Sequence, residues 1–155
     1  MKRILTLLLL WPFLSMAQMQ IDLPITWDDP AVDYTVVDFG NNVSSVVVDP
    51  TNPSNFVLQS TKTDSAATWA GTTLGNQSLA NPIPFASGNT IIKVVVWSPD
   101  ANIPVRLKAE DHTDAGISGE TQVNTTVAGA WDTLVFDFSN PAPGTCLLYT
   151  SLMAR

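Results

Sequence analysis

The sequence predicts an all-β protein, an antiparallel β-sandwich of the jelly-roll type. All 15 Val residues and 15 of the 17 Thr residues fall within residues 18–145, and both residue types favour strands over helices. Clusters of Gly, Pro, Asn and Asp interrupt this segment about every 8–14 residues, which is typical of a sandwich. Apolar and polar residues also alternate along its later part, as they do in strands with one buried face.

Eight stretches are predicted as strands, because each is rich in β-branched or aromatic residues and is bounded by turn signals. They are residues 34–39, 44–48, 56–62, 68–74, 90–97, 105–111, 120–127 and 131–138. Turn residues occupy 40–42, 49–53, 63–66, 75–88, 98–100, 113–119 and 128–130. Residues 18–145 therefore form one domain.

The alternation assigns a buried and a solvent-exposed face to the stretch 105–112. One side is apolar and is expected to face the core: Val105, Leu107 and Ala109. The opposite side is polar: Arg106, Lys108, Glu110 and His112.

Two further stretches show their own patterns of apolar residues. The stretch 131–138 places its large apolar residues on one side, which predicts that they enter the core: Leu134, Phe136 and Phe138. The stretch 91–97 is apolar on both sides except for Lys93. This pattern predicts a central strand covered on both faces.

Residues 1–17 have the organisation of a secretory signal peptide. Lys2 and Arg3 precede an apolar run over 4–14, and the small residues Ser15 and Ala17 mark a cleavage site. The apolar run has only about 11 residues, short of the ~20 that span a bilayer, so a membrane anchor is the weaker alternative. We expect the mature protein to be secreted and extracellular.

Residues 146–155 break with the composition of the preceding chain. They resemble the translation of an adapter used in transposase-based sequencing libraries, so we expect a non-native tail; a native apolar C-terminal strand is the alternative. Cys146, the only cysteine, falls in this tail. The genuine segment would then stop at Thr145 and be a fragment of a longer secreted protein.

The charge of the domain excludes some classes of partner. Residues 18–145 contain four basic and 14 acidic side chains, for a formal charge of −10. Such a field repels nucleic-acid phosphates and anionic lipid headgroups. Neutral glycans or bound cations suit it better, and we expect no membrane partner for the mature form.

A hairpin of 105–112 with 119–127 would join two polar faces into one surface. Its members are Arg106, Lys108, Glu110, His112, Glu120, Gln122 and Asn124. Amide, carboxylate and guanidinium groups can each bind two neighbouring sugar hydroxyls. An ordinary solvated face is the equally weighted alternative, since antiparallel sheets commonly expose one polar side.

Four tryptophans follow the signal peptide: Trp27, Trp69, Trp97 and Trp131. Sugar rings stack on exposed aromatic faces, whereas most buried aromatics only pack. Trp131 opens a strand and is expected to pack. For Trp69 and Trp97 the sequence does not decide between packing and ligand contact. Trp97 lies an even number of residues from Lys93 in the same predicted strand, so the two side chains are expected to share one polar face.

Residues and motifs typical of catalytic sites are scarce, so we expect that the protein is not an enzyme. His112 is the sole histidine, and the sequence holds no G-x-S-x-G elbow or glycine-rich phosphate loop. Glu110 and Glu120 could approach the spacing of a glycosidase pair if their strands are adjacent. A surface pair bridged by Arg106 or Lys108 is the favoured alternative.

Three segments, 25–30, 104–114 and 130–139, resemble a recurrent secreted module of Bacteroidetes-type bacteria. That module is similar to the galactose-binding-like jelly rolls of carbohydrate-binding modules, and the resemblance spans about residues 21–144. It implies a non-catalytic sandwich attached to polysaccharide-degrading enzymes or surface proteins, often followed by a C-terminal sorting domain for export to the bacterial cell surface. The resemblance also implies that the last strand or strands, and a linked catalytic or sorting domain, are lost from this sequence. The sequence departs from the family pattern at Thr145, because the family continues through one or two more strands.

Asp28 and Asp29 resemble the first part of a structural calcium site found in related jelly rolls. Calcium takes 6–8 oxygen ligands, so two carboxylates do not suffice, and the remaining ligands would lie in the missing part. An Asp-Asp-Pro turn is the alternative. No other cofactor is expected.

Together these features predict an extracellular, non-catalytic module that binds a polysaccharide or oligosaccharide. The candidate ligand contacts are Trp69, Trp97, Arg106, Lys108, Glu110, His112 and Gln122. A structural or adhesion spacer with the same fold is the alternative, and a small glycosidase or lyase fragment is a third, weaker hypothesis.

Overall fold

The computed structural model describes residues 17–75, 78–86, 88–139 and, for the backbone, 151–154. Within these ranges the chain forms strands and turns and no helix, which confirms the predicted all-β class. The strands are β1 (Met19–Gln20), β2 (Val32–Asp33), β3 (Val36–Phe39), β4 (Asn42–Asp49), β5 (Asn52–Lys62), β6 (Gly71–Leu74), β7 (Ile91–Ser98), β8 (Pro104–Asp111), β9 (Asp114–Asn124), β10 (Ala130–Asp137) and β11 (Ser151–Ala154).

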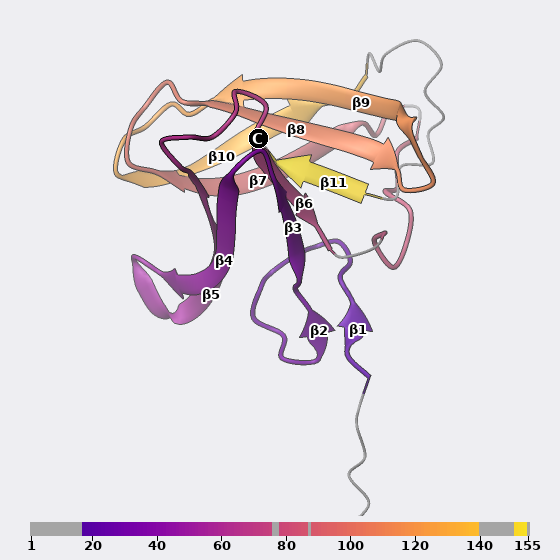
Figure 1. Cartoon of the computed structure of the whole chain (residues 1–155), viewed down its shortest axis with the longest axis horizontal. Coiled ribbons are helices and arrows are strands. Elements are labelled where there is room, and N and C mark those ends of the chain that lie inside the picture. The colour runs from indigo at the N-terminus through magenta and orange to yellow at the C-terminus, as the bar shows by residue number, and fades with distance from the viewer. Residues whose placement is uncertain (1–16, 76–77, 87, 140–150, 155) are drawn as a thin grey trace, which may run out of the picture.

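The strands form one large sheet and three small pairs (Figure 1). The large sheet has the order β3-β6-β11-β8-β9, and all its neighbours are antiparallel. β7 pairs with β10 and β4 with β5, both antiparallel, whereas β1 and β2 pair in parallel. No helical segment in the described ranges could span a lipid bilayer.

The core lies between the large sheet and the β7–β10 pair. Leu107 and Ala109 of β8 and Leu134 and Phe136 of β10 are buried in one cluster, joined by Phe138 just after β10. The faces predicted for these two strands are therefore confirmed. Two antiparallel layers with their apolar sides turned toward each other are compatible with the predicted sandwich.

The predicted hairpin is present, but its second strand starts earlier than expected. β8 and β9 pair from Pro104 opposite Asn124 to Glu110 opposite Ser118. The expected loop over 113–119 is wrong, because the chain reverses directly after Asp111. The Asp111 carboxylate accepts hydrogen bonds from the backbone N–H and hydroxyl of Thr113, at 2.8 and 2.7 Å, and these bonds hold its pKa below the ordinary value.

β7 is not the doubly covered central strand that its sequence predicts. It pairs with β10 alone among the described strands, and Ile91, Val95 and Trp97 are 44%, 61% and 37% exposed. The opposite side of β7 packs against the core through Ile92, Val94 and Val96. The two apolar sides of β7 therefore have different surroundings: one packs against the core, and the other is exposed to solvent.

The chain before β6 turns where a strand was expected. The predicted strand 68–74 begins only at Gly71, because the backbone N–H of Ala70 bonds the carbonyl of Ala67 at 2.9 Å and closes a turn. β5, in contrast, begins at Asn52 rather than at 56. The turn at 67–70 is what brings Trp69 onto the surface.

β11 lies inside the segment expected to be a non-native tail. It occupies the space between β6 and β8, with Leu152 opposite both Leu74 and Ala109. Residues 146–150 and 155 of that segment, including Cys146, lie outside the described residues, as do residues 1–16 of the predicted signal peptide over 1–17.

Candidate functional site

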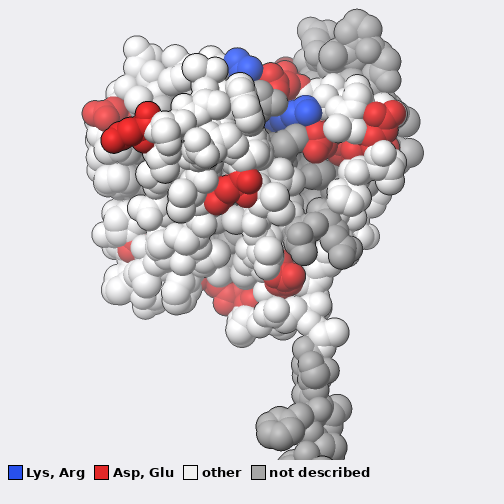
Figure 2. Space-filling model, in the orientation of Figure 1, with Lys and Arg blue, Asp and Glu red and all other residues white. Residues whose placement is uncertain are grey.

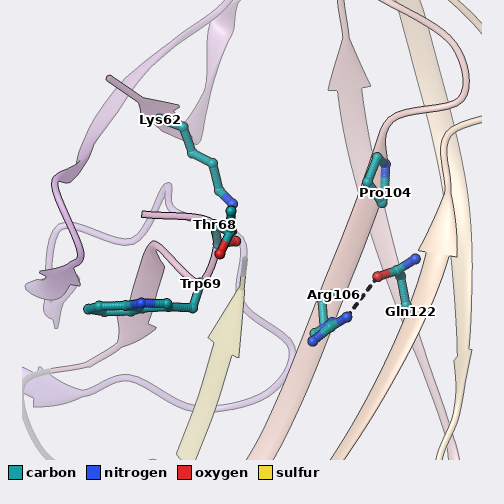
Figure 3. Close-up of a pocket in the computed structure, with 6 residues that line it drawn as sticks. All are labelled: Lys62, Thr68, Trp69, Pro104, Arg106 and Gln122. Atoms are coloured by element: carbon teal, nitrogen blue, oxygen red, sulfur yellow. Dashed lines mark hydrogen bonds between the residues drawn. The ribbon is translucent and has the colours of Figure 1, made fainter. Parts of the chain in front are cut away.

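A shallow pocket of about 250 Å³ lies on the outer side of the large sheet, between the turn before β6 and the hairpin β8–β9 (Figure 3). We call it the Trp69 pocket, and its lining residues are Lys62, Thr68, Trp69, Pro104, Arg106 and Gln122. It lies beyond the last paired residue of β11, since Ala154 stands opposite Thr72 and Leu107. Three predicted ligand contacts meet here: Trp69, Arg106 and Gln122.

Trp69 forms one wall of the pocket and is 56% exposed. Its indole stacks on the ring of Phe39, with centroids 6.2 Å apart and planes at 9°. Gly40 lies so close that an added Cβ would come within 2.9 Å of the indole atom Cζ3. The indole is therefore held by neighbours on one side while much of its surface stays open to solvent.

Arg106 and Gln122 form the opposite wall (Figure 3). They are direct partners across the β8–β9 hairpin, and Arg106 Nη2 donates to Gln122 Oε1 at 3.1 Å. Arg106 Nη1 donates to Glu120 Oε1 at 3.0 Å. Bonds from both guanidinium nitrogens fix the plane of this side chain, and the amide NH₂ of Gln122 keeps its donors for a ligand.

Lys62 enters the pocket from β5. Its ammonium donates to the backbone carbonyl of Thr68 at 3.2 Å, which ties the end of β5 to the turn that carries Trp69. The turn before it, at 63–66, is held by Asn41, whose side chain donates to the carbonyl of Ser65 at 3.2 Å.

The remaining polar residues of the hairpin lie farther along it. Lys108 Nζ contacts Glu110 Oε2 at 2.8 Å, and both side chains are largely covered, at 16% and 13% exposure. Glu110 stands opposite Ser118 and Glu120 opposite Lys108, so each glutamate has a cation beside it. Among the described residues the two glutamates are thus ion-paired with separate cations, whereas the sequence-based alternative had a single Arg106 or Lys108 side chain bridging them.

His112 does not continue the row of Arg106 and Lys108. The register shifts between Glu110 and Asp111, and His112 follows β8 in the exposed turn. Because β8 ends at Asp111, the two-residue alternation on which the sequence-based placement depended does not extend to His112. His112 lies next to Asp111 and contributes, as the smallest influence, to the lowered pKa of that carboxyl.

Trp97 lies on the other sheet, away from the Trp69 pocket. It stands opposite Trp131 on the outer side of the β7–β10 pair, on the side of Lys93. The polar face predicted for Trp97 is wrong, because its neighbours on that side include the exposed Ile91 and Val95. Trp131 is half-buried, and its Nε1 donates to Thr51 Oγ1 at 2.8 Å, which fits the expected packing role. The sequence left the roles of Trp69 and Trp97 undecided between packing and ligand contact. The structure places them apart, with Trp69 at the pocket and Trp97 on the β7–β10 pair.

The carboxylates of Asp28 and Asp29 each accept a hydrogen bond from a backbone N–H. Asp28 Oδ1 accepts from the N–H of Phe56 and Asp29 Oδ1 from the N–H of Ala31, both at 2.9 Å. The first bond fastens the N-terminal segment to β5, and the second closes a tight turn. No group of three or more His, Cys, Asp or Glu in the described ranges could hold a metal ion.

A larger hollow of about 510 Å³ lies among the N-terminal strands and is a weaker candidate. It is lined mainly by residues 19–34, with no Lys or Arg. Asp22 accepts a hydrogen bond from Asn81, and the ring of Tyr34 packs against Trp27 with centroids 5.2 Å apart. Its polar and aromatic groups are thus engaged in packing the N-terminal segment.

Sequence reasoning missed Lys62, Thr68 and Pro104. Each stands at a predicted strand boundary, where local patterns carry little information about facing partners. Comparisons of the chain with protein-family models, curated proteins and solved structures give no match. The site must therefore be interpreted from its geometry and chemistry.

Proposed function

We propose that the chain is a secreted, non-catalytic carbohydrate-binding module that binds a polysaccharide at the Trp69 pocket. One observation supports this above the others: a half-exposed indole, held by Phe39, lines the same pocket as the oriented polar groups of Arg106 and Gln122, with its ring directed away from them (Figure 3). Sugars have apolar C–H faces for the ring and hydroxyls for the polar wall. In this proposal the module holds a covalently attached enzyme or a cell surface near its glycan.

The carboxylates near the pocket suit recognition better than catalysis. Glu120 is ion-paired with Arg106, and Glu110 is ion-paired with Lys108 and largely covered, at 13% side-chain exposure. A shallow site gains a few net hydrogen bonds of about 1 kcal/mol each and one stacking contact, so we expect a Kd of roughly 10⁻⁵ to 10⁻³ M.

Affinity electrophoresis of the purified chain in gels containing β-glucan, xylan, galactan, pectin or alginate tests the proposal. We expect retention by at least one glycan, and we expect Trp69→Ala and Arg106→Ala each to reduce it several-fold. Trp97→Ala is the matched control, because it removes an exposed indole from the other sheet. Equal losses in Trp69→Ala and Trp97→Ala would contradict the proposed site.

The alternative function is a structural or adhesion module without a sugar ligand. The open apolar side of β7–β10 favours it, since Ile91, Val95, Trp97 and Val135 form an exposed apolar surface there that suits packing against protein. Failure of all the glycans to retain the folded chain would replace the carbohydrate-binding proposal with this one.

A further inference from the structure

Positive charge is concentrated in the Trp69 pocket of an otherwise acidic domain. Residues 18–145 have four basic side chains, and two of them, Lys62 and Arg106, line this pocket. No acidic residue is among its described lining residues. On the visible face in Figure 2, acidic groups are widely spread, whereas the basic groups gather near the top.

The two cations are not equivalent. Arg106 is ion-paired with Glu120 at 3.0 Å, so its charge is largely balanced. Lys62 bonds the neutral carbonyl of Thr68, and the ion pairs found in the described part of the chain do not include it. An ammonium has three donors and a full positive charge. Since Lys62 uses one donor on Thr68, it can offer its remaining donors and its charge to a ligand in the pocket.

We infer that the Trp69 pocket selects anionic sugars, with Lys62 as the residue that determines this specificity. The inference rests on the proposed carbohydrate-binding function and names the class of glycan. The anionic group, a uronate carboxylate or a sulfate ester, lies against the Lys62 ammonium while the sugar ring stacks on Trp69. Arg106 and Gln122 bind ring hydroxyls, because Glu120 already balances the guanidinium charge.

The acidic surroundings oppose the binding of a polyanion, because 14 carboxylates outnumber the basic groups of the domain. The attraction for an anionic sugar at this pocket therefore has to come from Lys62, which lines it and is in neither of the ion pairs of the described residues. Two exposed charges in contact are worth about 1 kcal/mol in water, or roughly a fivefold change in affinity. This attraction weakens as salt screens it.

The test compares Lys62→Met, Lys62→Arg and Lys93→Met in affinity gels. Polygalacturonate supplies carboxylates, a sulfated galactan supplies sulfate esters, and xyloglucan is the neutral probe. Lys93 is the matched control, because it is an exposed lysine on the outer side of β7. We expect Lys62→Met to weaken retention by an anionic glycan about fivefold, and Lys62→Arg and Lys93→Met to leave it within twofold.

The two anionic probes show which group is preferred, and retention by either one supports the inference. Equal losses in Lys62→Met and Lys93→Met would overturn it, since the effect would then follow net charge. Retention by xyloglucan alone, unchanged in Lys62→Met, would overturn the inference and leave the carbohydrate-binding function standing. Failure of every probe to retain the wild-type chain would overturn both.

Discussion

The indole of Trp69 lies almost parallel to the ring of Phe39, 6.2 Å away between centroids. Phe39 ends β3 opposite Gly71, the first residue of β6, so the pairing of these strands places the turn carrying Trp69 over Phe39. An aromatic contact of this kind is worth about 0.5–1.5 kcal/mol beyond the burial of its surface. It orients the ring that would meet a sugar.

Gly40→Ala should disturb this arrangement. Gly40 has φ +65, and an added Cβ would lie 2.9 Å from both Ala70 Cα and Trp69 Cζ3. The left-handed backbone alone costs about 1–2 kcal/mol for a residue with a Cβ, and the contact with Trp69 adds to it. We expect a lower free energy of unfolding in urea and weaker glycan retention.

Gly129→Ala is the control for that experiment. Gly129 has φ +62, and an added Cβ there meets nothing within 4 Å, so this variant carries the backbone cost without the contact. We expect a smaller loss of stability and unchanged retention. The same loss in both variants would show that the close approach of Gly40 to Trp69 is unimportant.

Arg106→Lys should separate charge from geometry at the pocket. Lysine keeps the positive charge but cannot reach Glu120 and Gln122 at the same time with a planar fork. The Arg106 side chain is 42% exposed, so we expect stability to change by less than about 1 kcal/mol. Glycan retention should fall several-fold, and retention equal to that of the wild type would show that only the charge matters.

Asp38→Asn should reduce the sensitivity of the fold to acid. Asp38 Oδ1 accepts from Asn42 Nδ2 at 2.9 Å and Oδ2 from the N–H of Ser44 at 2.7 Å. Burial raises the pKa of Asp38, but these hydrogen bonds outweigh it and hold the pKa below its ordinary value. The folded state therefore binds the proton more weakly than the unfolded state does.

The stabilisation by Asp38 is present above about pH 4 and is lost as the pH falls through the lowered folded pKa. Urea unfolding between pH 7 and pH 2 should show a lower stability at neutral pH and a shallower acid decline in Asp38→Asn. Asp64→Asn, in the exposed loop after β5, is the control. Parallel acid declines for wild type and Asp38→Asn would contradict this expectation.

Removal of residues 146–155 tests the role of β11. A chain ending at Thr145 lacks the strand between β6 and β8, which leaves two strand edges open to intermolecular pairing. We expect a loss of more than about 1 kcal/mol in the free energy of unfolding and more aggregation by light scattering. An unchanged melting temperature would instead support the sequence-based expectation of a foreign tail that contributes nothing.

Val95→Lys should increase solubility without weakening the fold. Val95 is 61% exposed on the outer side of β7, within an apolar surface beside an open strand edge. A lysine there breaks the patch and discourages edge pairing. Thr133→Lys, opposite Val95 on β10, adds the same charge without removing an apolar side chain, and equal solubility of the two variants would show that charge alone is responsible.

The sequence by itself determined the class of fold and the faces of its clearest strands. β8 and β10 start and end within one residue of their predicted bounds, and Leu107, Ala109, Leu134 and Phe136 are buried as expected. Alternation is a local property, so it can be read along the chain without knowing the neighbours. It also placed Arg106 and Gln122 on one hairpin surface, because two consecutive strands with a short connection pair with each other.

Only the tertiary structure decided which tryptophan joins that surface. Trp69 and Lys62 reach it through the pairing of β3 with β6 and through the turn at 67–70, whereas Trp97 belongs to the other sheet. The start of β9 was missed for a local reason: 114–119 contains two glycines and resembles a loop, yet Asp114, Ser118 and Gly119 pair with β8. The placement of Trp69 and Lys62 depends on partners distant in sequence, and periodicity along one strand does not contain that information.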